Sequence, residues 1–158
     1  MKKVMFLAMV FVLLFSSFSF AAGLTFVSLT FSSTDKKQIA ELVYTWETAA
    51  NGVFPTESLA RGITGQLKWY YLDMMITDPL TPAPTTLYDI VIRDQYTVDI
   101  LGGKGADRSA TEGEQVVPQV GGVEGDRLIT TELQVEISGN SVNAASGKFV
   151  LIFIKGES

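Results

Sequence analysis

The sequence predicts an all-β chain, folded as an antiparallel β-sandwich or barrel of about seven or eight short strands. One observation behind this prediction is a period of two in several segments. For example, Tyr88, Ile90 and Ile92 share one side of a half-buried strand. A second observation is the set of turn signals between these segments, such as Asn51-Gly52. At 158 residues, the chain has the length of one domain with a real core.

The composition restricts the chemistry that the chain can perform. It contains no cysteine and no histidine, so disulfides, thiolate metal sites and the usual serine–histidine or cysteine–histidine nucleophile pairs are excluded. The net charge is -5 and becomes about -7 without the first 21 residues, which contain Lys2 and Lys3 but no acid. Such a surface repels phosphate backbones, so we expect no nucleic-acid partner.

The N-terminal segment resembles a secretory signal peptide. Two lysines precede an apolar run over 4–15, and small residues with Ala21-Ala22 follow. Cleavage after Ala21 or after Ala22 satisfies the pattern. The apolar run is shorter than the roughly 20 residues of a spanning helix, although Phe18 and Phe20 could extend it into a retained membrane anchor. We therefore expect a signal peptide or an anchoring hydrophobic helix over 1–22, and a single β domain over 23–158.

Three segments come before the aromatic stretch 66–77. Residues 24–31 (LTFVSLTF) are β-rich and predict the first strand. Residues 36–50 could form a helix capped by the preceding serines, but the β-branched and aromatic alternation over 42–46 favours a strand. We expect 55–65 to be irregular, because Pro55 and two glycines interrupt it.

The segment 66–77 (QLKWYYLDMMIT) is the most aromatic of the chain. It is apolar on both faces, with Leu72, Met74 and Ile76 sharing one of them, which predicts a central strand between two packed layers. The three prolines that follow within 78–86 predict a stiff linker, because proline cannot donate to a ladder.

The stretch 84–109 predicts a β-hairpin. The first strand ends at Asp94-Gln95, a second strand covers 98–101, and Gly102-Gly103 ends it. The region 104–125 is rich in Gly, Ser, Thr and Glu, and contains one short apolar pair, so we expect a long loop.

The C-terminal third has the clearest strand patterns. Apolar residues alternate with polar ones over 129–137, and a turn region over 138–147 follows. The segment 148–155 (KFVLIFIK) predicts an apolar strand with a lysine at each end, and such lysines are a usual protection against edge pairing.

Two motifs invite a chemical interpretation. Gly102-Gly103-Lys104-Gly105 lacks the spacing of a phosphate-binding loop, so a glycine turn is the better interpretation. The acids Asp89, Asp94, Asp99 and Asp107 could gather around calcium, but their spacing fits no EF-hand and aspartates commonly cap turns. A carboxylate pair for glycoside cleavage needs a defined separation that the sequence does not establish. We therefore expect no catalytic residue, no metal and no cofactor.

The aromatic residues Trp46, Trp69, Tyr70 and Tyr71 could form a platform for stacking sugars. In a strand, Trp69 and Tyr70 point to opposite faces, so at least one of them belongs to the core. We expect most of the four in the core, with one or two exposed.

The stretch from Pro84 to Arg108 resembles a known family. Its residues Pro84-Thr85, Tyr88-Asp89, Asp94, Asp99-Ile100-Leu101, Gly103, Gly105 and Arg108 are similar in order to small, poorly characterised proteins encoded among the structural genes of tailed bacteriophages. The likeness extends more weakly over 42–155. It implies a β-rich virion or virion-associated subunit without known catalysis. Two features differ from the family: Tyr96-Thr97 replace a glycine-containing turn, and virion proteins need no export signal.

These observations predict a non-enzymatic structural subunit that is exported, surface-layer or virion-associated and that forms homo-oligomers or packs with other structural subunits. A membrane contact would run through residues 1–22. The alternative is an exported binding module for a glycan or another cell-surface ligand, with an exposed aromatic platform. The expected ligand or partner contacts are Trp46, Trp69, Gly103, Gly105, Asp107 and Arg108.

Overall fold

The structure is a computed structural model that describes residues 22–34 and 37–156. Over this part the chain is mostly β, arranged in several antiparallel sheets, so the all-β prediction is confirmed. The hydrophobic segment expected over 1–22 lies, apart from Ala22, outside the described residues. Within the ranges described, no helix is long and apolar enough to cross a membrane.

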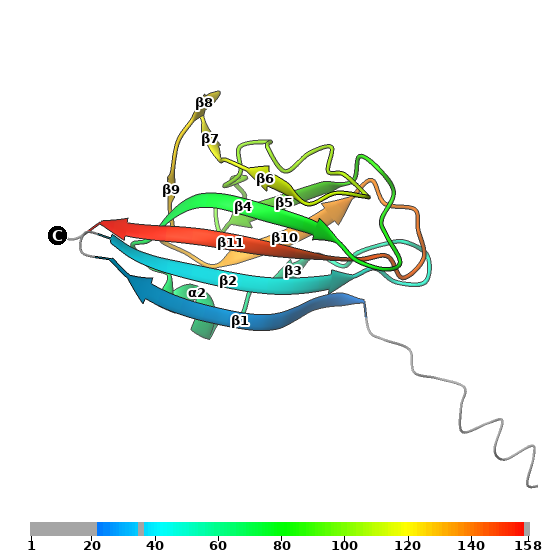
Figure 1. Ribbon diagram of the computed structural model, residues 1–158, viewed down its shortest axis with the longest axis horizontal. Helices are drawn as coiled ribbons and strands as arrows, with labels where there is room; N and C mark the ends of the chain where they lie inside the picture. The colour runs from blue at the N-terminus through cyan, green and yellow to red at the C-terminus, as the bar shows by residue number, and fades with distance from the viewer. Residues whose placement is uncertain (1–21, 35–36, 157–158) are drawn as a thin grey trace, which may run out of the picture.

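The larger sheet, which we call sheet A, contains the long strands of the fold side by side, with two short strands beside them (Figure 1). Its order is β1-β2-β11-β4-β6, and β9 also pairs with β4. The strands are β1 (Gly23–Ser33), β2 (Lys37–Glu47), β11 (Ser146–Gly156), β4 (Tyr71–Pro79), β6 (Glu114–Val116) and β9 (Arg127–Leu128). All of their pairings are antiparallel. β1 is therefore an edge strand.

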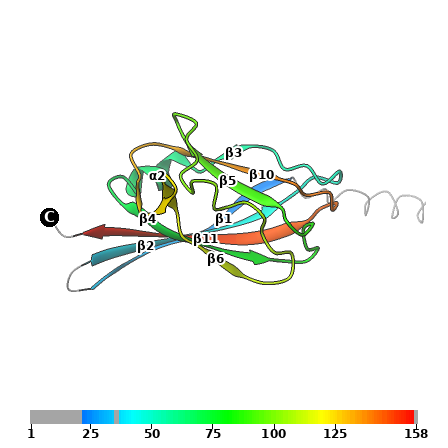
Figure 2. The same cartoon turned by 90° about the horizontal axis from the view of Figure 1, so that it is seen from above.

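The smaller sheet, sheet B, lies in a second layer over one face of sheet A (Figure 2). Its order is β3-β10-β5. The strands are β3 (Glu57–Ser58), β10 (Leu133–Ser138) and β5 (Asp89–Asp94), and a separate hairpin is formed by β7 (Gln119–Val120) and β8 (Val123–Glu124). The described part thus has more strands than expected, because several of them contain only two or three residues.

One hydrophobic core fills the space between the sheets. Inward side chains come from alternate positions of each strand, because successive side chains of a strand point to opposite faces. The largest fully buried side chains include Trp46, Tyr88, Phe149 and Phe153. β10 contributes Leu133, Val135 and Ile137, as its alternation predicted, although the strand begins at Leu133 and not at Ile129.

β11 is a central strand, bonded to β2 on one side and to β4 on the other. Phe149, Leu151 and Phe153 point to the core, and Val150 and Ile152 lie half-buried on the opposite face. The interpretation of its terminal lysines as edge protection is therefore wrong.

β4 lies next to β11 but pairs on its other side with only the short β6 and β9. A β-bulge interrupts its register, because Ile152 pairs with Met74 while Phe153 pairs with Leu72. The extra residue shifts the alternation, so Leu72 is buried together with Met75 and Thr77. The expected common face of Leu72, Met74 and Ile76 is therefore wrong, and sheet B covers only one face of the strand.

The segment 55–65 is not irregular throughout. It contains β3 and the start of a short helix, α2 (Arg61–Gln66). Leu59 and Leu67 on either side of the helix are buried, and Thr64 within it is buried too. Packing of these residues stabilises the helix despite its two glycines, which lower intrinsic helix propensity.

Two further expectations need correction. The second strand predicted over 98–101 is reduced to one bridge, between Arg93 and Asp99, followed by turns. The long loop expected over 104–125 contains β6, β7 and β8, and β6 extends sheet A beside β4.

Candidate functional site

The segment from Gly103 to Arg108 lies against the free edge of β5. The Ile90 amide donates to the Gly105 carbonyl (2.8 Å), and the Arg108 amide donates to the Tyr88 carbonyl (2.7 Å). Gly105 is buried, and a Cβ there would collide with the Ile90 carbonyl oxygen. The segment therefore closes an edge of sheet B, and Gly105 is needed for that close approach.

Arg108 and Asp107 differ in their surroundings. The Arg108 guanidinium donates to the Ala106 carbonyl from Nε (2.9 Å) and Nη2 (2.6 Å), and Nη1 lies 3.5 Å from Glu114. Its side chain is mostly buried, so its donors serve the loop. Asp107 and Gly103 are exposed and have positive φ angles. Of the expected contacts in this loop, Gly103 and Asp107 thus face solvent.

The aspartates of this region cap backbone amides. Asp94 accepts bonds from the amides of Tyr96 and Val98. Asp99 does the same for Leu101 and Gly103, at 2.9 and 2.6 Å. The described residues contain no group of three or more acids that could hold a metal ion. These carboxylates therefore act as turn caps.

The two tryptophans have opposite environments. Trp46 is 1% exposed, with its ring 5.5 Å from that of Tyr88 between centroids, so it offers no face to a ligand. Its place as a candidate contact was wrong, because β2 directs it into the core. Trp69 is 60% exposed and precedes β4 in a turn with a φ of 71°.

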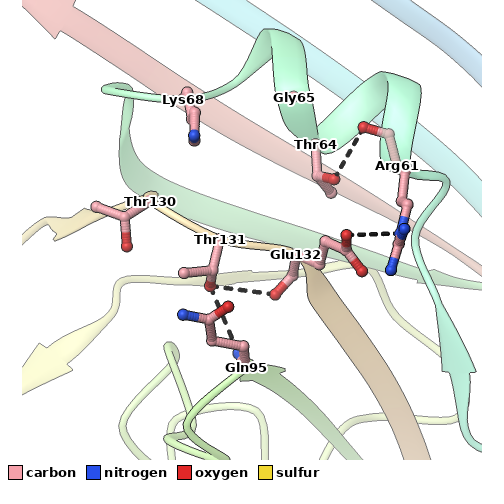
Figure 3. Close-up of a pocket in the computed structure, with 8 residues that line it drawn as sticks. All are labelled: Arg61, Thr64, Gly65, Lys68, Gln95, Thr130, Thr131 and Glu132. Carbon is pink, nitrogen blue, oxygen red and sulfur yellow. Dashed lines mark hydrogen bonds and ion pairs between the residues drawn. The ribbon is translucent and has the colours of Figure 1, made fainter.

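An open polar cleft of about 470 Å³ lies between α2 and the segment before β10 (Figure 3). Its lining residues are Arg61, Thr64, Gly65, Lys68, Gln95, Thr130, Thr131 and Glu132. Arg61 Nε pairs with Glu132 Oε1 at 2.7 Å, and both side chains are largely exposed. The cleft suits binding of a polar ligand.

The edge strand β1 forms the other candidate surface. Its eleven residues (GLTFVSLTFSS) contain neither a charge nor a proline, two of the usual protections of an edge. The strand does contain a β-bulge between Phe26 and Ser28, which is another. Within the described part, no hydrogen bond joins Thr25–Ser33 to any strand other than β2. At its start, the Leu24 amide donates to Glu57 Oε2 of β3 (2.9 Å).

The inner face of β1 extends beyond sheet B. Phe26 and Phe31 pair with Tyr44 and Ala40, which belong to the core, so their side chains point to the same side. Nevertheless, Phe26 is 46% and Phe31 49% exposed. Sheet A is wider than the three-stranded sheet B, which leaves these aromatic rings partly uncovered.

The sequence analysis identified neither the polar cleft nor the β1 edge. The cleft joins Arg61, Gln95 and Glu132, which are distant in the sequence, so no local motif marks it. The edge position of β1 depends on strand order, but the absence of charge over Gly23–Thr34 was a visible signal.

Comparison of the chain with protein-family models, with curated proteins and with solved structures finds no match.

Proposed function

We propose that the protein is a non-enzymatic β-sandwich subunit that self-associates and serves a structural role. One observation carries the proposal: sheet A ends in β1, a long, uncharged strand whose outer backbone groups have no strand partner in the described part. Monomeric β proteins protect such edges, because an open edge is a template for another strand. An open edge of this length is suited to an assembly interface.

The absence of enzymatic activity is part of the proposal and is supported by the composition and by the contacts of the acidic side chains. The chain has neither histidine nor cysteine. Asp89, Asp94 and Asp99 of the hairpin region accept bonds from backbone amides, and the acid in the polar cleft is paired with Arg61. These contacts leave none of them arranged with a partner for proton transfer.

The site of action is proposed from the N-terminal sequence and the resemblance to phage structural proteins. The subunit would be exported or virion-associated, and membrane-anchored if residues 1–22 are retained. Intact mass and N-terminal sequencing of the native protein, with its fraction recorded, test this part. A start at Ala22 or Gly23 in a soluble exported fraction supports a secreted subunit, and a retained Met1 in membranes or particles supports an anchored one.

Self-association is tested by sedimentation velocity of the purified protein over a concentration series. We expect a shift from monomer to a larger species as the concentration rises. A protein that stays monomeric at the highest soluble concentration and binds no particle would contradict the proposal.

A second candidate function is an exported glycan-binding module. It is favoured by Trp69, which is exposed and follows Lys68 of the polar cleft. Exposed tryptophan beside polar groups is suited to stacking on sugar rings. A glycan array, followed by fluorescence titration of any hit, tests it. Because Trp46 is buried, a response that persists in Trp69→Phe would refute this placement of the site.

A further inference from the structure

The backbone of β1 determines what kind of partner this edge can bind. In an antiparallel strand, alternate residues direct their amide and carbonyl groups to opposite sides. Leu24 belongs to the set that faces away from β2, because its amide reaches Glu57. Every second residue of β1 faces outward in the same way, and the β-bulge between Phe26 and Ser28 shifts this alternation by one residue. A row of such groups is satisfied by another extended strand.

The other sheet edges in the described part are short or closed. β6 and β9 on the far side of sheet A have three and two residues. In sheet B, β3 has two residues, and the outer edge of β5 is closed by backbone hydrogen bonds to the segment 98–108. Among the described strands, the long open edge available on a second copy is therefore β1 itself.

We propose that β1 pairs antiparallel with β1 of a second copy across a two-fold axis, which joins the two A sheets into one continuous sheet. This inference rests on the proposed self-association and names its interface. A two-fold axis makes the same edge serve both partners, as in most homodimers. β1 has no charged side chain of its own, so no like charges of the two strands meet across the pair. At its start, the Glu57 carboxylate must leave the Leu24 amide before that residue can pair with the second copy.

The β-bulge selects the register. Opposite residues must share a face, and the core-side residues of β1 are Leu24, Phe26, Leu29 and Phe31, since each pairs with a core residue of β2. Placing the axis between Val27 and Ser28 sets Phe26 opposite Leu29 of the second copy, and Leu24 opposite Phe31. Thr25 then faces Thr30 on the outer side.

This register covers the exposed aromatic rings. Phe26 and Phe31 of each copy gain apolar neighbours from the other copy, on the side where sheet B does not reach. Cross-strand pairs of aromatic and aliphatic side chains stabilise a sheet. The pairing thus adds buried apolar surface to the backbone hydrogen bonds.

Disulfide trapping tests the arrangement, because the chain has no cysteine of its own. Across the proposed axis, the Cα atom of Val27 lies about 6 Å from the Cα atom of Val27 in the second copy, which is within the range for a disulfide. The two Ser32 residues of the dimer lie about 30 Å apart, and the two Thr25 residues about 17 Å apart. We expect Val27→Cys to form a covalent dimer on mild oxidation, and Ser32→Cys to stay uncrosslinked.

A mixture of Thr25→Cys and Thr30→Cys proteins gives a second measurement. These positions face each other across the axis, so we expect a crosslink in the mixture and none in either protein alone. Circular dichroism confirms that each variant is folded.

The outcomes separate this inference from the proposed function. An oligomer in which Val27→Cys does not crosslink, or in which Ser32→Cys crosslinks equally well, overturns the two-fold pairing but leaves self-association in place. A monomeric wild-type protein overturns both.

Discussion

Gly147 of β11 lies directly opposite Trp46 of β2, and a Cβ added to Gly147 would be 2.6 Å from the indole Cε2. The buried indole therefore occupies the space that a side chain on the neighbouring strand would need. Because β11 is a central strand of sheet A, Trp46 packs against the middle of the sheet from within the core.

Gly147→Ala is expected to destabilise the fold by about 1–3 kcal/mol, because the indole must move within a close-packed core. The midpoint of urea unfolding measures the loss. Gly65→Ala is the matched control: its Cβ would meet no atom within 4 Å, and α2 should gain up to about 1 kcal/mol of helix propensity. Equal midpoints for Gly147→Ala and wild type would contradict the packing of Trp46 against Gly147.

Tyr88 gives a prediction for the dependence of stability on pH. Burial raises the pKa of the Tyr88 phenol to about 12, with a further increase from Glu114 that Arg108 opposes. The pKa of the Tyr88 phenol is higher in the folded protein than in the unfolded chain. The stability that the neutral phenol contributes is therefore fully present below pH 10. It declines as the pH rises toward 12, by about 2–3 kcal/mol in total.

Tyr88→Phe should therefore lose less stability than wild type between pH 10 and 12 in urea unfolding. At pH 7 the two proteins should differ little, because the phenol oxygen has no hydrogen-bond partner in the described part. Absorbance at 295 nm provides a direct titration. Parallel stability curves for the two proteins over this pH range would refute the shift.

The edge-closing role of the segment at Gly105 predicts a contrast between two glycines. Gly105→Ala should cost about 1–3 kcal/mol, because the new Cβ forces the loop away from Ile90 and weakens the bonds to β5. Gly103→Asn should be nearly neutral, since its Cβ position is open and asparagine tolerates a positive φ. Thermal unfolding compares them, and a larger loss for Gly103→Asn would contradict this role.

The tryptophans predict a fluorescence result. Acrylamide should quench Trp69 strongly and Trp46 weakly, because 60% of Trp69 but 1% of Trp46 is exposed. Trp69→Phe should therefore remove most of the quenchable emission, and its folding serves as the control for ligand titrations. Strong quenching that remains in Trp69→Phe would show that Trp46 is accessible.

Local patterns predicted much of the fold. The alternation over 129–137 and the β-branched residues over 42–46 identified strands correctly, because a half-buried strand needs that period. The phase of β4 was not predictable, since the bulge opposite Ile152 and Phe153 is a feature of the pairing. Similarly, KFVLIFIK gave a strand but not its central position, because strand order is set by contacts between distant segments.

The candidate contacts were predicted less well for the same reason. Trp46 and Trp69 both follow aromatic patterns, but only the position of each backbone decides which ring is exposed. Gly105 and Arg108 were expected as ligand or partner contacts, and the structure gives them contacts within the chain that close the edge of β5. The β1 edge became visible only when the strand order was known.

The most direct test of the assembly account is sedimentation equilibrium of wild type, Val27→Lys and Val123→Lys. A lysine on β1 places like charges near each other across the proposed axis, whereas Val123 lies on β8 and is already 71% exposed. We expect wild type and Val123→Lys to self-associate equally and Val27→Lys to dissociate at least tenfold more readily. Equal association of all three proteins would show that β1 is not the interface.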